Sequence, residues 1–456
     1  MRFATNKWRA LPFAPPLQQL LESVRGIITN TSWLVATTAL NAVLGLAYWG
    51  AAARFFPPDI VGVAAASVTA MILISTFGML GFGSLLLGGI SQRASEAPAL
   101  IATALITTGL VSGGLGIGTA LLAPFVSRDF AFLRHDPATI AIFTLGGVLL
   151  TVSLVLNQAL IGRGRGSWQF WQNAAMAATK LLLIVAIGFG GWWPISWLTI
   201  YLTWVIAMLV SLLGLGLFAL TRGGALASYR PRWRLLRGMG RQALDHHIIN
   251  LALLLPGQIL PLIVTAILSS TENAYYYTAW QFAGFIFAPP VALSISLYAT
   301  ANGTSAALRR RLRFTLSAAF AIGVAANIVA YFGGGIALSL YGADYAREAL
   351  WPLRIIGIGV FPLIVKDHYV ALCRIKGHLG GAIPLIIGGS LLELLLAAYG
   401  GTRAQLNGLV LGWLAAVCIE AILMAWPLIR AVVGKQPHIA AAAQQYLPWW
   451  AQAPTD

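Results

Sequence analysis

Residues 51–87 read AAARFFPPDIVGVAAASVTAMILISTFGMLGFGSLLL, and this stretch indicates the fold. One apolar segment ends at Phe56, a short turn follows at Pro57-Pro58-Asp59, and a second apolar segment runs from 60 to 90. A helix needs about 20 apolar residues to span a membrane. The stretch therefore predicts two antiparallel transmembrane helices joined by a tight turn.

The composition extends this interpretation to the whole chain. Of its 456 residues, 59% are hydrophobic and 9% are charged, whereas soluble domains carry about 25% charged residues. This excludes an ordinary cytosolic enzyme, a disordered protein and a nucleic-acid binder. The net charge of +16 fits basic loops at a membrane surface. The two cysteines both lie in apolar runs, which excludes a disulfide scaffold and a zinc cluster.

Apolar segments separated by turn residues predict an all-α polytopic membrane protein with about 12 transmembrane helices. The expected spans are 30–56, 60–90, 97–123, 138–162, 169–190, 196–220, 241–269, 275–301, 311–332, 350–373, 380–399 and 405–430. Their alternation places 21 Lys and Arg residues on one side of the membrane and six on the other. By the positive-inside rule the basic side, which holds both termini, is cytoplasmic.

The longest loop divides the chain into two sets of six spans. Each set opens with a helix and a short turn that carries an acid, Asp59 or Glu272, which helix capping also explains. We therefore expect two pseudo-symmetric six-helix lobes around a central cavity. The expected parts are an interfacial arm (1–29), a first lobe (30–220), a basic cytoplasmic loop (221–240), a second lobe (241–432) and an interfacial tail (433–456).

Catalytic machinery is absent from the sequence. No connecting loop exceeds about 25 residues, which leaves no room for a soluble catalytic domain. No phosphate-binding loop of the Walker type is present, and the histidines lack partners at metal-ligand spacing. We expect no enzymatic activity, no cofactor and no metal site.

Charged residues inside apolar spans are the candidate functional groups, because each is costly to insert. The candidates for proton or cation coupling are Asp367, Glu393, Glu420 and Asp245. The in-span cations Lys366 and Lys180 are candidates for binding an anionic head group. A snorkelling side chain or an ion pair between helices is the structural alternative for each in-span charge. Lys180 and Glu393 lie on the fifth span of each half, and their pairing across the interface between the halves is one hypothesis.

Aromatic and proline residues single out the seventh and eighth spans. Trp280 lies deeper than the tyrosines of an interfacial belt and is a candidate to stack on a sugar ring. Pro256 and Pro261 in the seventh span, and Pro289-Pro290 in the eighth, predict broken helices that line a cavity.

The stretch 51–87 resembles the first helical hairpin of bacterial polysaccharide flippases, which belong to the multidrug/oligosaccharidyl-lipid/polysaccharide exporter superfamily. Residues 274–303, AYYYTAWQFAGFIFAPPVALSISLYATANG, resemble the matching segment of the second half, and 351–380, WPLRIIGIGVFPLIVKDHYVALCRIKGHLG, resemble the region of the tenth helix. The resemblance implies alternating access between two six-helix lobes. It also implies that basic residues in the cavity hold a pyrophosphate. The residues of this chain that the resemblance offers for that role are Lys366, Lys180, Arg54, Arg25 and Arg241.

From this resemblance we expect a flippase that moves an undecaprenyl-pyrophosphate-linked oligosaccharide to the outer leaflet of the bacterial inner membrane, for lipopolysaccharide or exopolysaccharide synthesis. Its expected partners are this lipid-linked sugar, membrane lipids, and a polysaccharide polymerase or glycosyltransferases. A cation-coupled multidrug antiporter of the same superfamily is the main alternative. A membrane glycosyltransferase or polymerase would need a large outer loop, and a structural membrane subunit is a further alternative.

Overall fold

The computed structural model describes residues 15–90, 96–126, 128–134, 136–191, 193–221, 230–234, 241–299, 305–377 and 379–433. Side chains are described from Ser32 onward, except at 84, 87–89, 126, 128–129, 241–247, 249–250, 299, 305 and 379–381. This part of the chain is helical throughout and contains no strand. The helices are α1 (Pro15–Phe55), α2 (Pro58–Gly78), α3 (Phe82–Gly89), α4 (Ala97–Val126), the short 3₁₀ helix η1 (Arg128–Arg134), α5 (Pro137–Gly162), α6 (Gly166–Gly190), α7 (Trp197–Thr221), α8 (Arg241–Ile267), α9 (Ser270–Ala299), α10 (Ser305–Ser339), α11 (Ala343–Glu348), α12 (Leu350–Ile358), α13 (Val360–Lys376) and α14 (Leu379–Val433).

The expected all-α membrane fold is confirmed. Ten described helical segments are long and apolar enough to cross a membrane, and α8 adds a shorter apolar segment, Leu251–Ile267. The last of the ten lies in α14, which is two helices joined at Ala404 and Gln405, where the backbone leaves the helical region. Every one of the twelve expected spans therefore coincides with helical structure.

Local backbone geometry explains where the helices differ from the expected spans. The span expected at 60–90 divides into α2 and α3 because Leu80 and Gly81 have left-handed backbone angles, with φ of 48° and 78°. Helix α1 begins at Pro15, well before the expected residue 30. The prolines do not interrupt α8 or α9, which continue as helices through them; the prediction of broken helices there was wrong.

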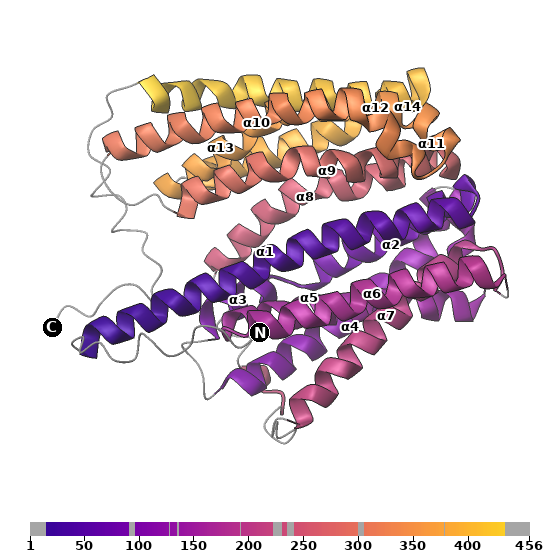
Figure 1. Ribbon diagram of the computed structural model, residues 1–456, viewed down its shortest axis with the longest axis horizontal. Helices are drawn as coiled ribbons and strands as arrows, with labels where there is room; N and C mark the ends of the chain where they lie inside the picture. The colour runs from indigo at the N-terminus through magenta and orange to yellow at the C-terminus, as the bar shows by residue number, and fades with distance from the viewer. Residues whose placement is uncertain are drawn as a thin grey trace.

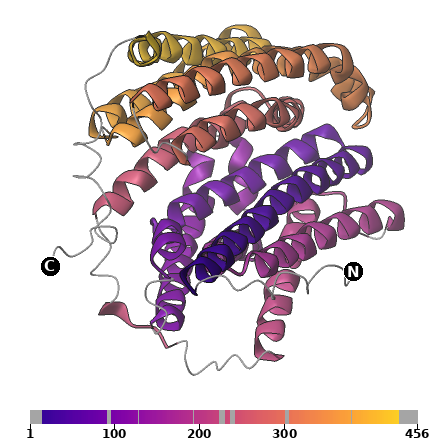
Figure 2. The same cartoon turned by 60° about the vertical axis from the view of Figure 1, so that its left-hand side comes forward.

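The helices form two groups, α1–α7 and α8–α14, which stay separate in both views (Figures 1 and 2). Within the first group α1 packs on α6 and α4 packs on α5, and within the second α13 packs on α14. Helix α2 makes the main contact between the groups, because it lies against α8 and α9. This gives the two-lobe architecture, while the exact lobe boundaries stay a prediction.

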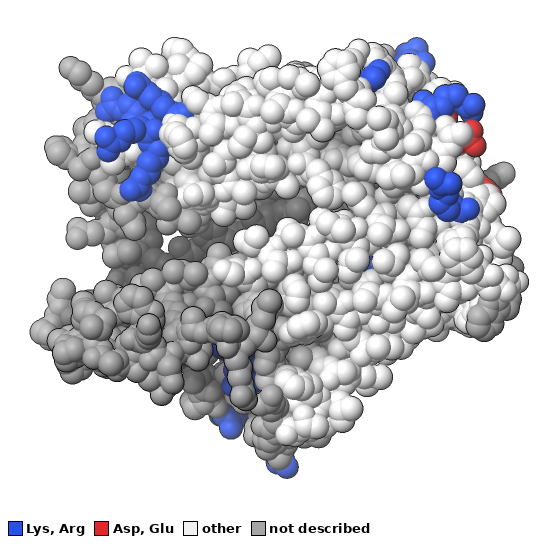
Figure 3. Space-filling model, viewed as in Figure 1, with Lys and Arg blue, Asp and Glu red and all other residues white. Residues whose placement is uncertain are grey.

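The two ends of the bundle differ. At one end, which we call the closed end, α1 ends at Phe55 and α9 begins at Ser270; at the other, the open end, α9 ends and α10 begins. The largest buried cluster joins both lobes in the half near the closed end, whereas the clusters nearer the open end each belong to a single lobe. Figure 3 shows a hollow between the lobes at the open end.

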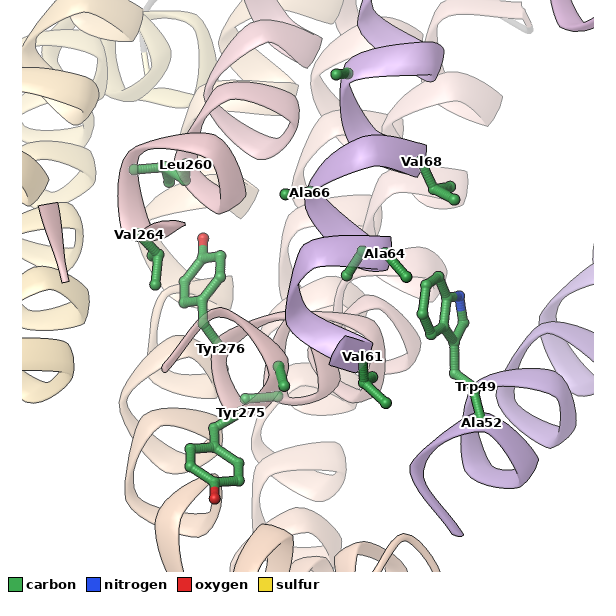
Figure 4. Packing of buried hydrophobic residues seen from close by; sticks show 14 of the residues in the cluster. Trp49, Ala52, Val61, Ala64, Ala66, Val68, Leu260, Val264, Tyr275 and Tyr276 are labelled. Carbon is green, nitrogen blue, oxygen red and sulfur yellow. The ribbon is translucent and has the colours of Figure 1, made fainter. Parts of the chain in front are cut away.

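Small side chains let the lobes meet closely in the shared half. Figure 4 shows α2 between Trp49 of α1 on one side and Leu260, Val264 and Tyr276 of the second lobe on the other. The α2 residues at this contact include Ala64 and Ala66, which are almost fully buried.

Basic residues gather at both ends, and the band between them is almost free of charged atoms on the face shown in Figure 3. For the basic residues that the structure describes, the connectivity places those expected on the cytoplasmic side at the open end and those expected outside at the closed end. The grouping of charges agrees with the sequence analysis. The assignment of the open end to the cytoplasm stays a prediction.

Candidate functional site

A buried ionic cluster lies inside the second lobe. The Nζ atom of Lys366 on α13 lies 2.6 Å from Oε1 of Glu393 and 2.7 Å from Oε2 of Glu420, both on α14. The three side chains are at most 4% exposed. Three of the charged residues that the sequence singled out therefore meet at one point.

The fourth member of the cluster is Trp413, which sequence reasoning missed. Its indole Nε1 donates a hydrogen bond of 2.8 Å to Oε2 of Glu393. The carboxylate of Glu420 is less satisfied, because neither of its oxygens has a hydrogen-bond partner among the described residues, although Oε2 forms the ion pair with Lys366. A buried tryptophan needs a partner for its N–H, and an in-span glutamate twenty residues earlier was the available signal.

The break in α14 brings the two glutamates together. Gln405 has a left-handed backbone with φ of 55°, so the chain turns back on itself between Glu393 and Glu420. The two arms of this hairpin touch through glycines: a Cβ at Gly400 would meet the backbone of Gly408. Small residues commonly permit such close approach of helices in membranes.

Two further glycines make room for the cluster. A Cβ on Gly389 would collide with the carboxyl group of Glu420, and one on Gly359 would collide with the ring of Trp413. The absence of a Cβ at Gly389 and Gly359 therefore leaves room for the side chains of Glu420 and Trp413.

Aromatic rings connect the cluster to the interface between the lobes. Trp413 packs edge-on against Trp280 of α9, with ring centroids 5.3 Å apart. Trp280 in turn stacks near Tyr276, at 5.8 Å, and Tyr276 lies toward Leu260 and Val264 (Figure 4). Trp280 is thus held by other aromatic rings, and its expected role of stacking on a sugar stays a prediction.

Lys180 lies apart from this cluster, in the first lobe. Its Nζ atom lies 3.6 Å from the ring centroid of Trp204 and 5.3 Å from that of Tyr48, and the residue is 7% exposed. No acidic side chain among the described residues lies within ion-pair distance of it. The hypothesis that Lys180 pairs with Glu393 was wrong, because the folded-back α14 and the adjacent α13 give Glu393 a nearer partner.

The remaining candidates do not join the cluster. Asp367 follows Lys366 in sequence and therefore points about 100° away around the helix; it is half-buried and forms no ion pair in the described part of the chain. Arg54 lies at the closed end. The side chains of Arg25, Arg241 and Asp245 lie outside the described residues.

Polar contacts join the lobes at the closed end. Arg54 donates from Nε to the carbonyl of Leu340 at 2.8 Å, and Asn273 donates from Nδ2 to the carbonyl of Gly62 at 2.9 Å. The hydroxyl of Tyr341 donates to the carbonyl of Leu46 at 2.8 Å. Burial raises the pKa of Tyr341 above its ordinary value, which keeps this phenol protonated as a donor.

A network of amides in the first lobe was also missed. The side-chain nitrogen of Gln172 donates to Ser153 at 2.9 Å and to Ser211 at 3.2 Å, and Asn173 contacts Asn41 of α1 and Asn157 of α5. These contacts satisfy polar groups between α1, α5, α6 and α7. Among the described residues, no three His, Cys, Asp or Glu side chains gather as they would around a metal ion.

Solved structures show the same fold. An inward-facing multidrug resistance MATE family transporter of the MOP superfamily matches with a TM-score of 0.65 and 14% identity, over 87% of this chain and 96% of that one. An outward-facing structure described in the same terms matches with a TM-score of 0.60 and 15% identity, over 92% and 96%. A MOP superfamily transporter from Pyrococcus furiosus, whose binding pocket is described as having reversed polarity, matches with a TM-score of 0.58 and 14% identity, over 89% and 96%. No family model and no curated protein matches the sequence.

Proposed function

We propose that this chain is a cation-coupled antiporter of the multidrug type, which moves amphiphilic molecules across the membrane by alternating access. The observation that carries the proposal is the buried cluster of Lys366, Glu393 and Glu420. In the proposal this cluster binds the coupling proton, and the bacterial inner membrane is its location.

Charge balance supports the choice of a proton. Two ionised carboxylates and one ammonium carry a net charge of −1, and a net charge in a buried site is costly. One added proton neutralises the cluster. The free Oε1 of Glu420 offers a place for that proton.

The open hollow supports alternating access. If the open end is cytoplasmic, as the positive-inside rule indicates, the structure presents its cavity to the cytoplasm and is sealed outside. The best-matching of the three structures described above is likewise an inward-facing one.

The aromatic chain supplies a route from the proton site to the lobe interface. Glu393 holds the indole of Trp413, and Trp413 contacts Trp280 on α9, the helix that packs on α2. A change of charge at Glu393 therefore acts on a side chain that contacts a helix of the moving interface.

Transport in proteoliposomes tests the proposal. The full-length protein is reconstituted, an imposed pH gradient drives transport, and uptake of a fluorescent hydrophobic cation is measured. Glu420→Gln keeps the shape of the side chain and removes its charge, so gradient-driven uptake should fall to the level of empty vesicles. Glu348→Gln removes an exposed acid that pairs with Arg347 at the closed end, and it should leave uptake unchanged. Full gradient-driven uptake by Glu420→Gln would overturn the assignment.

Flipping of an undecaprenyl-pyrophosphate-linked oligosaccharide is the second candidate, and Lys180 favours it. A buried ammonium that faces only aromatic rings among the described residues is suited to an anionic head group. Deleting the gene should then make this lipid accumulate on the cytoplasmic leaflet, and Lys180→Met should fail to relieve the accumulation. Higher sensitivity to cationic drugs without lipid accumulation would support the antiporter instead.

A further inference from the structure

A groove of about 450 Å³ runs between the lobes near the closed end. One wall is a single face of α1, and the other comes from the second lobe. Its lining is apolar except at one end, with Leu46, Ala47, Gly50, Ala51, Phe282 and Tyr341 along its length and Arg54 at its rim. The groove therefore has the form of an apolar channel with a cationic mouth.

The length of the groove matches one leaflet. From Leu46 to Arg54 the α1 helix rises about 12 Å, at 1.5 Å per residue. Half of a bilayer's hydrocarbon core is about 15 Å thick. An acyl chain that follows this face of α1 would start at the level of Arg54 and end near the middle of the membrane.

Arg54 has the charge and the spare donors for a phosphate. Its side chain is exposed and is oriented by the carbonyls of Leu340 and Ser339, at 2.8 and 3.3 Å. These bonds use Nε and Nη2, and no acidic side chain in the described part of the chain pairs with the guanidinium. Arginine binds phosphate oxygens through several N–H groups at once, so an anion can be added without breaking the bonds that hold the side chain.

We propose that this groove binds one anionic phospholipid from the leaflet at the closed end, with its phosphate on Arg54 and one acyl chain along α1. Because the walls belong to different lobes, the site exists in this form only while the closed end is shut. The lipid is therefore a ligand of this conformation and stabilises it. The proposal does not depend on which molecule the protein transports.

Photolabelling tests the site. The full-length protein is placed in phosphatidylcholine nanodiscs that contain phosphatidylglycerol with a photoreactive acyl chain, and labelled peptides are located by mass spectrometry. We expect label on residues 46–55 and 340–341.

Three variants test which features of the groove the label depends on. Arg54→Gln should reduce the amount of label about tenfold, as expected for the loss of a charge-assisted bond. Ala47→Trp, at an exposed position that lines the groove, should block the chain and abolish the label. Arg403→Gln, an exposed arginine beside Tyr399 on α14, is the matched control and should label like wild type.

Conformation provides a second measurement. Spin labels at the closed ends of α1 and α10 report the separation of the lobes by electron paramagnetic resonance. Phosphatidylglycerol should increase the closed population in wild type and in Arg403→Gln, but not in Arg54→Gln. Equal labelling by a phosphatidylcholine probe would overturn recognition of the anionic head group. Cross-links between two copies of the chain at these residues would overturn the lipid in favour of a dimer contact.

Discussion

Replacing Lys366 by methionine should destabilise the protein strongly, because it leaves two carboxylates buried without a cation. In the structure Lys366 lies within 2.7 Å of both Glu393 and Glu420, and all three side chains are at most 4% exposed. Removing one partner of a buried ion pair costs about 3–5 kcal/mol. We therefore expect Lys366→Met to lower the folding equilibrium constant by roughly two to four orders of magnitude.

The same reasoning predicts how the stabilities of the related variants rank. Glu420→Gln keeps the pair between Lys366 and Glu393 and makes the cluster neutral, so it should cost no more than about 1 kcal/mol. The triple variant Lys366→Met, Glu393→Gln, Glu420→Gln contains no buried charge in the cluster. It should recover at least half of the loss seen in the single Lys366 variant, because neutral replacement of a buried charged group is often tolerated.

Steric trapping in bicelles measures these free energies of unfolding in a lipid environment. The exposed pair of Arg347 and Glu348 is the control: Glu348→Gln should leave the free energy of unfolding unchanged, because water screens that interaction. A Lys366→Met protein as stable as wild type would refute the reasoning. So would a triple variant less stable than the single one.

Three further predictions concern other contacts. Trp413→Phe removes the hydrogen bond to Glu393 and should lower the free energy of unfolding by about 1.5–3 kcal/mol, as steric trapping can measure. Gly62→Ala places a methyl group on the backbone carbonyl of Ser270, so it should separate the lobes at the closed end and raise the labelling of a cysteine introduced there. Asp136→Ala removes the side-chain acceptor that caps the first turn of α5 and should cost about 1 kcal/mol, with no change in the direction of transport.

The fold could be predicted from sequence because its signals are local. Apolar length marks each span, and the placement of arginines fixes their alternation, so neither depends on how the helices pack. The turn at Pro57-Pro58-Asp59 marks the end of α1 to within two residues. The break between α2 and α3 was missed, because a non-glycine residue such as Leu80 gives no local sign of a positive φ.

The candidate site could be predicted only in part. Charge inside an apolar span singled out Lys366, Glu393 and Glu420 one by one. Their meeting depends on the direction in which α14 turns at Gln405 and on the packing of α13 beside it, and neither is encoded in a local pattern. Equivalent positions in two halves suggested Lys180 as the partner of Glu393, but symmetry of position does not bring side chains together when one lobe folds its last two helices into a tight hairpin.

The residues that pack between the two lobes differ from those that pack within each lobe, and this difference affects how the lobes can move. The buried residues of α2, the helix between the lobes, are mostly small (Gly, Ala, Ser and Thr), and Gly62 lies against the backbone of Ser270. Such a surface offers few interlocking side chains, so separating it forfeits less dispersion energy than opening a core of interdigitated rings. Within the second lobe, Trp413 and the ionic cluster tie α13 to both arms of α14, where separation would expose buried charge. The lobes should therefore move as rigid bodies about α2. The contact between the lobes at the closed end should separate before the helices within either lobe separate.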